Sequence, residues 1–239
     1  PDLPGRALPA RRPPLRRPKG SPLQRRQFSA LAAASLGLGL ARTAGAAIDP
    51  PLVPVTPQQF QALGKPVPVD APAGSVDVVE FFSYACPHCF EFEPKLENWL
   101  KTKPANVHFH RSPVHFLQNA ANFQPLYFAL EVMGLADAMQ LKVFNAVHLE
   151  HLRLDKPAAI AAFMTKNGVD AARFMSVFTS FGVRNKVAQA NQLFDAYGIA
   201  GVPTLGVQGR FVTSPSTAKG ESQALAAVDY LVAQVRAGH

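Results

Sequence analysis

Cysteine is scarce in this sequence, since its 239 residues include only two, Cys86 and Cys89. A fold held together by disulfides needs several bridges that close long loops, and a bridge between these two neighbours would close almost no loop. The scarcity therefore excludes a disulfide framework. It also makes the close pair a candidate reaction centre.

A long apolar run is missing as well. The uncharged stretch Phe28–Leu40 has 13 residues, which fits the ~7–15 residues of a signal-peptide core and falls short of the ~18 that span a membrane. Arg25-Arg26 precedes this stretch, and Ala44–Ala46 follows it as a small-residue cleavage site. We therefore expect residues 24–46 to be a signal peptide for export, cleaved near Ala46.

Residues 1–23 lack hydrophobic periodicity and are rich in proline and arginine. This composition predicts a disordered segment or an over-extended start ahead of the signal peptide. The arginine pair followed by Phe28 also resembles a twin-arginine signal. The residues leave open whether the Sec pathway or the twin-arginine pathway exports the protein.

An excess of basic residues is absent from the rest of the chain. The sequence has 24 Lys and Arg against 16 Asp and Glu, but nine of the basic residues and one acid lie in residues 1–46. Residues 47–239 therefore carry 15 of each and no net charge. Nucleic-acid-binding domains need a clustered basic surface. This balance excludes nucleic acid as a partner of the mature protein.

The two cysteines belong to the motif Cys86-Pro87-His88-Cys89, which stands between two predicted elements. The apolar run Val76–Phe82 precedes it and predicts a strand buried on both faces. Apolar residues at helical spacing follow it and predict a helix. At the start of a helix, backbone N–H groups and the helix dipole stabilise a thiolate at Cys86. Cys89, one turn farther along, is expected to be the less exposed sulfur.

The predicted order of elements is β-α-β, a helical block and β-β-α. Residues 107–111 alternate like a second strand, and a helical insertion is predicted at about 118–182. One more helix is expected at 183–197. Val67–Val69 is a candidate edge strand. Further strands are predicted at residues 199–202, 204–207 and 210–213, the last two joined at Gln208-Gly209 like a hairpin. A last amphipathic helix follows them.

A Cys-x-x-Cys motif after the first strand of a β-α-β unit is typical of thioredoxin-like proteins. The segment from Glu80 to Cys89 resembles the active-site segment of the DsbA family, oxidants that introduce disulfides in the bacterial periplasm. Gly201-Val202-Pro203-Thr204 resembles the cis-proline loop of that family. The resemblance covers nearly all of residues 47–239. It implies an α/β, thioredoxin-like fold with an inserted all-helical subdomain.

The resemblance, read together with the chemistry, suggests a role for each motif residue. Cys86 is expected to exchange with substrate thiols, and Cys89 to resolve the mixed disulfide. Pro87 and His88 lie between them, and a protonated or hydrogen-bonding His88 adds to the stabilisation of the thiolate. Pro203 is expected in the cis form, which turns the Val202 backbone outward to pair with an extended substrate strand.

Two acids lie close to this motif in the sequence. Glu80 interrupts an apolar strand, where an outward-facing edge position would be the simplest explanation. Burial of an unpaired carboxylate costs several kcal/mol, so a buried Glu80 would favour proton handling. Glu93 resembles another acid of the family, but no basic partner for it is evident ahead of Val107.

The leading hypothesis, with the location that the resemblance implies, is a monomeric periplasmic dithiol oxidase that donates the Cys86–Cys89 disulfide to unfolded exported proteins with free cysteines. The resemblance implies that a DsbB-type, quinone-linked membrane protein reoxidises it. No cofactor is expected beyond the redox-active disulfide. A disulfide isomerase or reductase is an alternative, although Ile48–Ala73 is too short for the N-terminal dimerisation domain that such isomerases often carry.

A copper- or zinc-binding chaperone is the alternative from a different class. Both thiolates and His88 could ligate a metal, but no methionine-rich segment or second Cys/His cluster supports the idea. His148 and His151 are three residues apart on a predicted helix. Two ligands do not make a site, so no metal is expected.

Overall fold

The computed structural model describes residues 55–117 and 121–238. The predicted signal peptide at 24–46, its cleavage site near Ala46 and residues 1–23 lie outside the described residues. Among the helices that are described, none is both long enough and apolar enough to cross a membrane.

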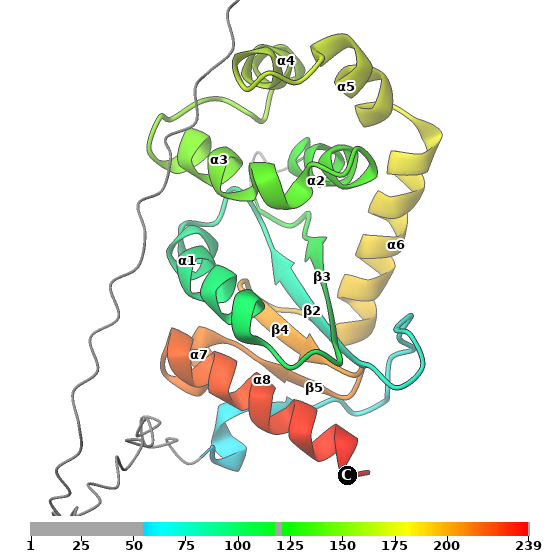
Figure 1. The fold of residues 1–239 in the computed structure, drawn as a ribbon, viewed down its shortest axis with the longest axis vertical. Helices are drawn as coiled ribbons and strands as arrows, with labels where there is room; N and C mark the ends of the chain where they lie inside the picture. The colour runs from blue at the N-terminus through cyan, green and yellow to red at the C-terminus, as the bar shows by residue number, and fades with distance from the viewer. Residues whose placement is uncertain (1–54, 118–120, 239) are drawn as a thin grey trace, which may run out of the picture. The chain divides into compact units, whose positions relative to one another are not determined.

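The described strands form one mixed sheet, in the spatial order β1-β5-β4-β2-β3 (Figure 1). β2 lies parallel to β3 and antiparallel to β4. All seven residues of β2 are buried, as expected for a strand covered on both faces. The strands are β1 (Gln61–Ala62), β2 (Val76–Phe82), β3 (Val107–Pro113), β4 (Thr204–Val207) and β5 (Phe211–Thr213).

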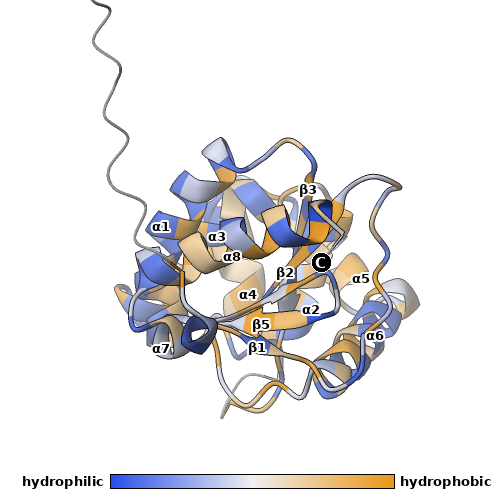
Figure 2. Cartoon of the chain, turned by 90° about the horizontal axis from the view of Figure 1, so that it is seen from below, coloured by the Kyte–Doolittle hydropathy of each residue, from blue (hydrophilic) through white to orange (hydrophobic). Residues whose placement is uncertain are grey.

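Helices cover both faces of the sheet. α1 (Pro87–Thr102) and α8 (Glu221–Arg236) share one apolar cluster with the first face. α6 (Phe181–Tyr197) contributes to the cluster on the other face. Figure 2 shows hydrophobic colour on strands such as β2 and β5. Two short helices, η1 (Pro57–Gln59) and α7 (Pro215–Ala218), complete this part of the chain.

Four helices between β3 and α6 form a separate apolar core, which agrees with the predicted helical insertion. Its buried cluster also includes Phe82, Tyr84, Cys86 and Cys89. The cysteine motif therefore lies where the helical subdomain meets the sheet. The four helices are α2 (Phe123–Val132), α3 (Ala136–His148), α4 (Pro157–Lys166) and α5 (Ala171–Phe178).

The predicted turn between β4 and β5 is confirmed. Gln208 and Gly209 have φ values of 51° and 60°, the conformation of a two-residue type I′ turn. The N–H of Val67 donates to the Gly209 carbonyl at 2.7 Å. A Cβ atom at residue 209 would lie 1.9 Å from the Val67 carbonyl oxygen, so this approach requires glycine.

Two predicted strands are wrong. Val67–Val69 is irregular, and the described edge beside β5 is β1 instead. Pro68 lacks the N–H that a sheet ladder needs. Residues 199–202 form a loop, because the N–H of Ile199 bonds the Phe194 carbonyl and caps α6 rather than joining the sheet.

Candidate active site

Cys86 is the residue that caps the N-terminus of α1, with Pro87 as the first helical residue. Proline suits this position, since a helix has no internal partner for the first N–H. The N–H of Cys86 donates to the Ser83 carbonyl at 3.0 Å, which closes the turn before the helix. Both cysteines are free thiols, Cys86 with 6% of its surface exposed and Cys89 with none. An incoming sulfur can therefore reach Cys86 alone.

The pKa values of the two thiols shift in opposite directions. A hydrogen bond from the Cys89 thiol is the main cause that lowers the pKa of Cys86 to about 6, against the opposing effect of burial. The N–H groups of Cys89 and His88 and the charge of His88 lower it further. Burial raises the pKa of Cys89 far above its ordinary value, and the nearby Cys86 adds to this effect. At neutral pH the pair therefore consists of one thiolate and one thiol.

His88 is exposed at the start of α1. Its Nδ1 lies 3.0 Å from the Oε2 of Glu91, and this hydrogen bond raises the pKa of His88. The cationic form favours the Cys86 thiolate. Water screens the charge, however, because 76% of the side chain is exposed.

Replacing His88 with alanine is expected to raise the pKa of Cys86 and to make the disulfide less oxidising. Because the charge is screened, we expect a shift in potential of no more than about 30 mV, a tenfold change in the equilibrium constant. Thiolate absorbance and equilibration with glutathione measure both quantities. The His110→Ala variant, which removes a histidine from β3, is the control. An unchanged pKa in His88→Ala would mean that the helix terminus and Cys89 alone set the acidity.

The loop before β4 lies beside the sulfur of Cys86. The Val202–Pro203 peptide bond is cis, as predicted. The Sγ of Cys86 lies 3.4 Å from the Val202 carbonyl oxygen, to which only its thiol form can donate. Thr204 Oγ1 donates to the Gly201 carbonyl at 2.8 Å. The backbone of this loop therefore faces the reacting atom.

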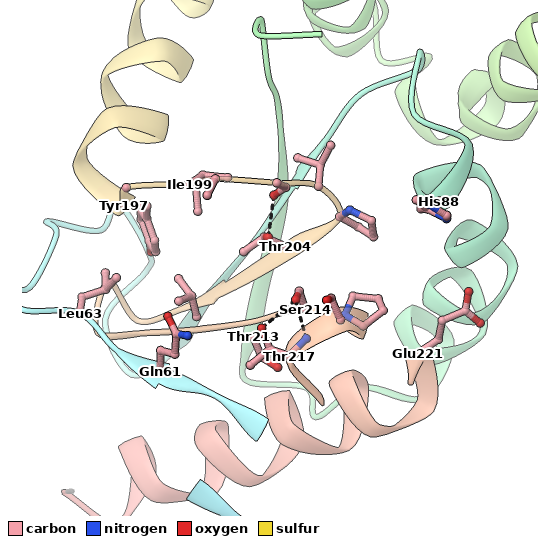
Figure 3. Close-up of a pocket in the computed structure, with 18 of the residues that line it drawn as sticks. Gln61, Leu63, His88, Tyr197, Ile199, Thr204, Thr213, Ser214, Thr217 and Glu221 are labelled. Atoms are coloured by element: carbon pink, nitrogen blue, oxygen red, sulfur yellow. Dashed lines mark hydrogen bonds between the residues drawn. The ribbon is translucent and has the colours of Figure 1, made fainter. Parts of the chain in front are cut away.

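Two hollows flank this loop. A cavity of about 670 Å³ runs from His88 and Pro203 toward β1, β5 and α7 (Figure 3). A second hollow, of about 420 Å³, adjoins Cys86 itself and includes Phe116 and Leu117 in its wall. The surface around the sulfur is thus concave and partly apolar, as a site for an extended polypeptide requires.

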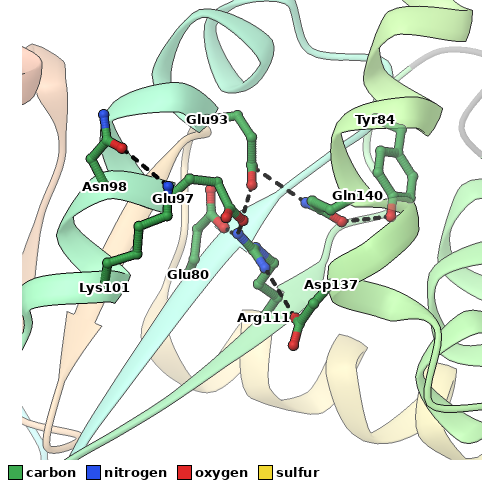
Figure 4. Close-up of polar contacts among 9 residues, drawn as sticks. All are labelled: Glu80, Tyr84, Glu93, Glu97, Asn98, Lys101, Arg111, Asp137 and Gln140. Carbon is green, nitrogen blue, oxygen red and sulfur yellow. Dashed lines mark hydrogen bonds and ion pairs between the residues drawn. The ribbon is translucent and has the colours of Figure 1, made fainter. Parts of the chain in front are cut away.

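Glu80 is fully buried in the middle of the sheet and does not occupy an outward edge position. Its Oε2 lies 2.9 Å from the Nε of Arg111 on β3. The same guanidinium lies 2.6 Å from Glu93 and 3.3 Å from Glu97, both on α1 (Figure 4). Arg111 is the basic partner that was not evident ahead of Val107, because it follows that residue on β3. Its guanidinium pairs with one carboxylate oxygen of each buried acid.

Both buried carboxyls, those of Glu80 and Glu93, are weaker acids here than a glutamate in water. Burial raises the pKa of Glu80 to about 7 and that of Glu93 to about 8, although Arg111 lowers both. Burial alone would lower the pKa of the Arg111 guanidinium, but the two carboxyls raise it above its ordinary value. A carboxyl with a pKa near 7 exchanges protons at neutral pH. The Oε1 of Glu80 has no hydrogen-bond partner among the described residues.

The acid cluster continues into the helical subdomain. Gln140 of α3 donates to the Oε2 of Glu93 at 3.4 Å and accepts a bond of 2.6 Å from the hydroxyl of Tyr84 (Figure 4). Tyr84 precedes the cysteine motif. The subdomain therefore contacts both the acids and the segment that leads to Cys86.

The two histidines proposed to share a helix do not do so. α3 ends at His148, and His151 lies beyond it with a φ of 54°. His148 bonds the Tyr84 carbonyl instead, at 2.9 Å. In the part of the chain that the structure describes, no group of three His, Cys, Asp or Glu side chains has the geometry to hold a metal.

Comparisons with known proteins agree with this arrangement. The DSBA-like thioredoxin domain matches residues 77–223. The thiol:disulfide interchange protein DsbA of Burkholderia cepacia is 40% identical over 201 residues, which cover 84% of this chain and 94% of that protein. The DsbA of Bordetella pertussis is 41% identical over 180 residues, or 75% and 85%. The crystal structure of Pseudomonas aeruginosa DsbA has a TM-score of 0.72 and 36% identity, and the match covers 76% of this chain and 94% of that one.

Proposed function

The chain belongs to the DSBA-like thioredoxin domain family and is a thiol:disulfide oxidoreductase of the DsbA type, and from this premise we propose that it works as a dithiol oxidase. The Cys86–Cys89 disulfide passes to substrate proteins. The observation that carries this direction is the position of Cys86 at the start of α1, where the Cys89 thiol and the N–H groups of His88 and Cys89 lower its pKa. A stabilised thiolate favours the reduced form, so the disulfide form becomes a strong oxidant.

The exchange takes two steps. A substrate thiolate attacks the Sγ of Cys86, the new S–S bond forms, and the Cys86–Cys89 bond breaks with Cys89 as the leaving group. A second substrate thiolate then attacks the substrate sulfur of the mixed disulfide and releases Cys86 as a thiolate. Two substrate thiols are oxidised to a disulfide and the cysteine pair is reduced. The low pKa of Cys86 makes it a good leaving group in the second step.

Glu80 is assigned the proton transfer to and from Cys89. Cys89 leaves as an anion in the first step and needs a proton, because burial raises its pKa. Burial raises the pKa of Glu80 to about 7, so this carboxyl can gain or lose a proton at neutral pH, and one of its oxygens has no partner among the described residues. Arg111 holds Glu80 in place and balances its charge, and Glu93 bonds the same guanidinium.

Glu80→Gln is expected to slow the attack of Cys89 on a Cys86–glutathione mixed disulfide by at least about tenfold at pH 7. A fully positioned acid or base contributes more, ~10²–10⁴ in rate. The rate in the wild type should rise through pH 7, while the variant should lose this dependence. Stopped-flow fluorescence across pH 5.5–8.5 measures both. Glu97→Gln removes a partly exposed carboxylate from the same arginine and serves as the control. Matching pH profiles for the wild type and Glu80→Gln would contradict the assignment.

The substrate is assigned to the loop and the hollows beside Cys86. An extended polypeptide can pair with the backbone at Val202, which precedes cis-Pro203. The apolar wall at Phe116 and Leu117 suits unfolded segments, which expose apolar side chains. The partners are therefore unfolded exported proteins with free cysteines. Recognition through backbone and apolar surface favours many clients over a single sequence.

The protein is assigned to the periplasm, where disulfides persist, and is expected to act as a monomer. The predicted signal peptide and the DsbA relatives support this location. Each turnover leaves Cys86 and Cys89 reduced, so a further oxidant is needed. A DsbB-type membrane protein that passes the electrons to quinone is the partner that the family relationship supports.

Equilibration with glutathione tests the proposed direction. The protein should remain largely reduced at ratios of oxidised to reduced glutathione that oxidise ordinary structural dithiols. Thiol trapping and mass spectrometry measure the fraction oxidised. A protein that is readily oxidised under these conditions would be a reductase instead. Titration of the reduced protein with Cu(I) and Zn(II) tests the metal-chaperone alternative, for which tight stoichiometric binding is required.

A further inference from the structure

His148 is the last residue of α3, and its side chain contacts both ends of the active-site segment. Its Nε2 lies 2.9 Å from the Tyr84 carbonyl oxygen. Its ring stacks on Phe90, with centroids 5.0 Å apart and planes 9° from parallel. Tyr84 stands two residues before Cys86, and Phe90 directly follows Cys89. One side chain from the helical subdomain therefore spans the cysteine motif.

The contact with Tyr84 defines which ring nitrogen carries the proton. A carbonyl oxygen can only accept, so the Nε2 of His148 must donate. Burial lowers the pKa of His148, and His151 acts in the same direction. The ring is therefore neutral at neutral pH, with its proton on Nε2. A second aromatic ring, that of Phe144, lies 6.1 Å away at 29° and keeps the imidazole in this plane.

The backbone between the two contacts holds the sulfur of Cys86. The turn that begins at Ser83 closes through the N–H of Cys86. The N–H of Phe90 donates to the Cys86 carbonyl at 3.2 Å and closes the first turn of α1. The N–H groups of His88 and Cys89, which stabilise the thiolate, lie inside that turn. A shift of either end would move these N–H groups relative to Sγ.

We propose that His148 is a positioning residue for thiol exchange, which holds the turn before Cys86 and the first turn of α1 so that the N–H groups of His88 and Cys89 point at the Cys86 sulfur. It touches no reacting atom in this structure, and it acts through Tyr84 and Phe90. The inference rests on the proposed oxidase function, since it concerns the same thiolate. It links the helical subdomain to the redox properties of the cysteine pair.

Three substitutions separate the two contacts. His148→Ala removes both, His148→Phe keeps a stacking ring without a donor, and His148→Gln keeps a donor without the ring. The alanine and phenylalanine variants are expected to shift the glutathione equilibrium roughly two- to tenfold toward the oxidised protein, the range of one neutral hydrogen bond. The glutamine variant is expected to stay within about twofold of the wild type. The acidity of Cys86, followed by thiolate absorbance, should change in parallel.

The control is His151→Asn, since His151 is an exposed neighbour whose positive φ asparagine tolerates. It should leave the glutathione equilibrium and the Cys86 acidity unchanged. A merely structural role of His148 would destabilise the oxidised and reduced forms alike and leave both readouts at the wild-type value, which would overturn the proposal. A folded His148→Gln variant that behaves like His148→Phe would also overturn it. If His148→Ala does not fold, the comparison of these two variants decides the question.

The wild-type protein measured in the same series separates the two hypotheses. If the wild type is strongly oxidising and His148→Phe matches it, the positioning role is wrong and the oxidase function stands. If the wild type is itself a weak oxidant, the oxidase function is wrong, whatever His148 does to the equilibrium.

Discussion

Replacing Cys86 with serine is expected to reduce disulfide transfer to the uncatalysed rate, while Cys89→Ser is expected to accumulate mixed disulfides at Cys86. The reason is access, since 6% of Cys86 is exposed and Cys89 is fully covered. An incoming thiolate therefore meets only the Sγ of Cys86. Without Cys89, no second sulfur in the protein can resolve the bond that forms there.

The trapped species are measured after incubation with a reduced, unfolded substrate protein and oxidised glutathione. Non-reducing electrophoresis and peptide mass spectrometry identify the linked cysteine. Alkylation of the reduced wild type at pH 6.5 should label Cys86 first, because its pKa is about 6 while that of Cys89 is raised. The double Cys86→Ser/Cys89→Ser variant is the control and should neither trap nor label. Mixed disulfides at Cys89 in the Cys86→Ser variant would reverse the assignment.

Local patterns in the sequence were sufficient for most of the fold. The apolar run Val76–Phe82 predicts β2, because a strand buried on both faces has no polar alternation. The apolar residues at helical spacing after the cysteine motif predict α1. Gln208-Gly209 predicts the β4–β5 turn, since few residues other than glycine tolerate a positive φ.

The buried acid cluster could be predicted only in part. Glu80 stands out in an apolar strand, but its partner depends on the parallel register of β2 and β3, which places Arg111 beside it. Arg111 looks like an ordinary polar residue in the alternating pattern of β3. Neighbouring strands are chosen by tertiary packing, so a single sequence does not reveal which residues face each other.

The errors have the same origin. Residues 199–202 have the apolar composition of a strand, but their backbone caps α6 and forms the loop before Pro203. His148 and His151 look like a helical pair until α3 is seen to end at the first of them. Helix ends are set by capping and tertiary contacts as much as by composition. The contact of His148 with Tyr84 is invisible without the fold.

The reduced protein is expected to be more stable toward unfolding than the oxidised protein, and the difference should grow as the pH rises from about 6. A disulfide between residues three apart constrains the unfolded chain very little. Reduction instead frees the Cys86 thiolate, which the start of α1 stabilises in the folded state alone. Thermodynamic linkage therefore requires a strong oxidant to be more stable when reduced.

The direction of the pH dependence follows from the pKa of Cys86. That pKa is about 6 in the folded protein against an ordinary value of 9.0, so between these values the folded reduced form binds fewer protons than the unfolded form. Its stability then rises with pH and is lost as the pH falls through 6. Each pH unit contributes at most ~1.4 kcal/mol, and solvent at the surface screens part of it. We expect the difference in unfolding free energy between the reduced and oxidised forms to widen by about 2 kcal/mol between pH 6 and pH 9.

Urea unfolding of both forms at pH 5, 6.5 and 8 measures this difference. Glu80 and Glu93 also titrate in this range, but they are present in both redox forms, so most of their effect cancels in the comparison. Cys86→Ser is the matched control, since it has neither a disulfide nor the Cys86 thiolate. Its free energy of unfolding should therefore lack the increase with pH by which the reduced form departs from the oxidised form. An oxidised form that is the more stable one at pH 8 would contradict the oxidase and favour a reductase. The same result would mean that the Cys86 thiolate gains little from the helix terminus.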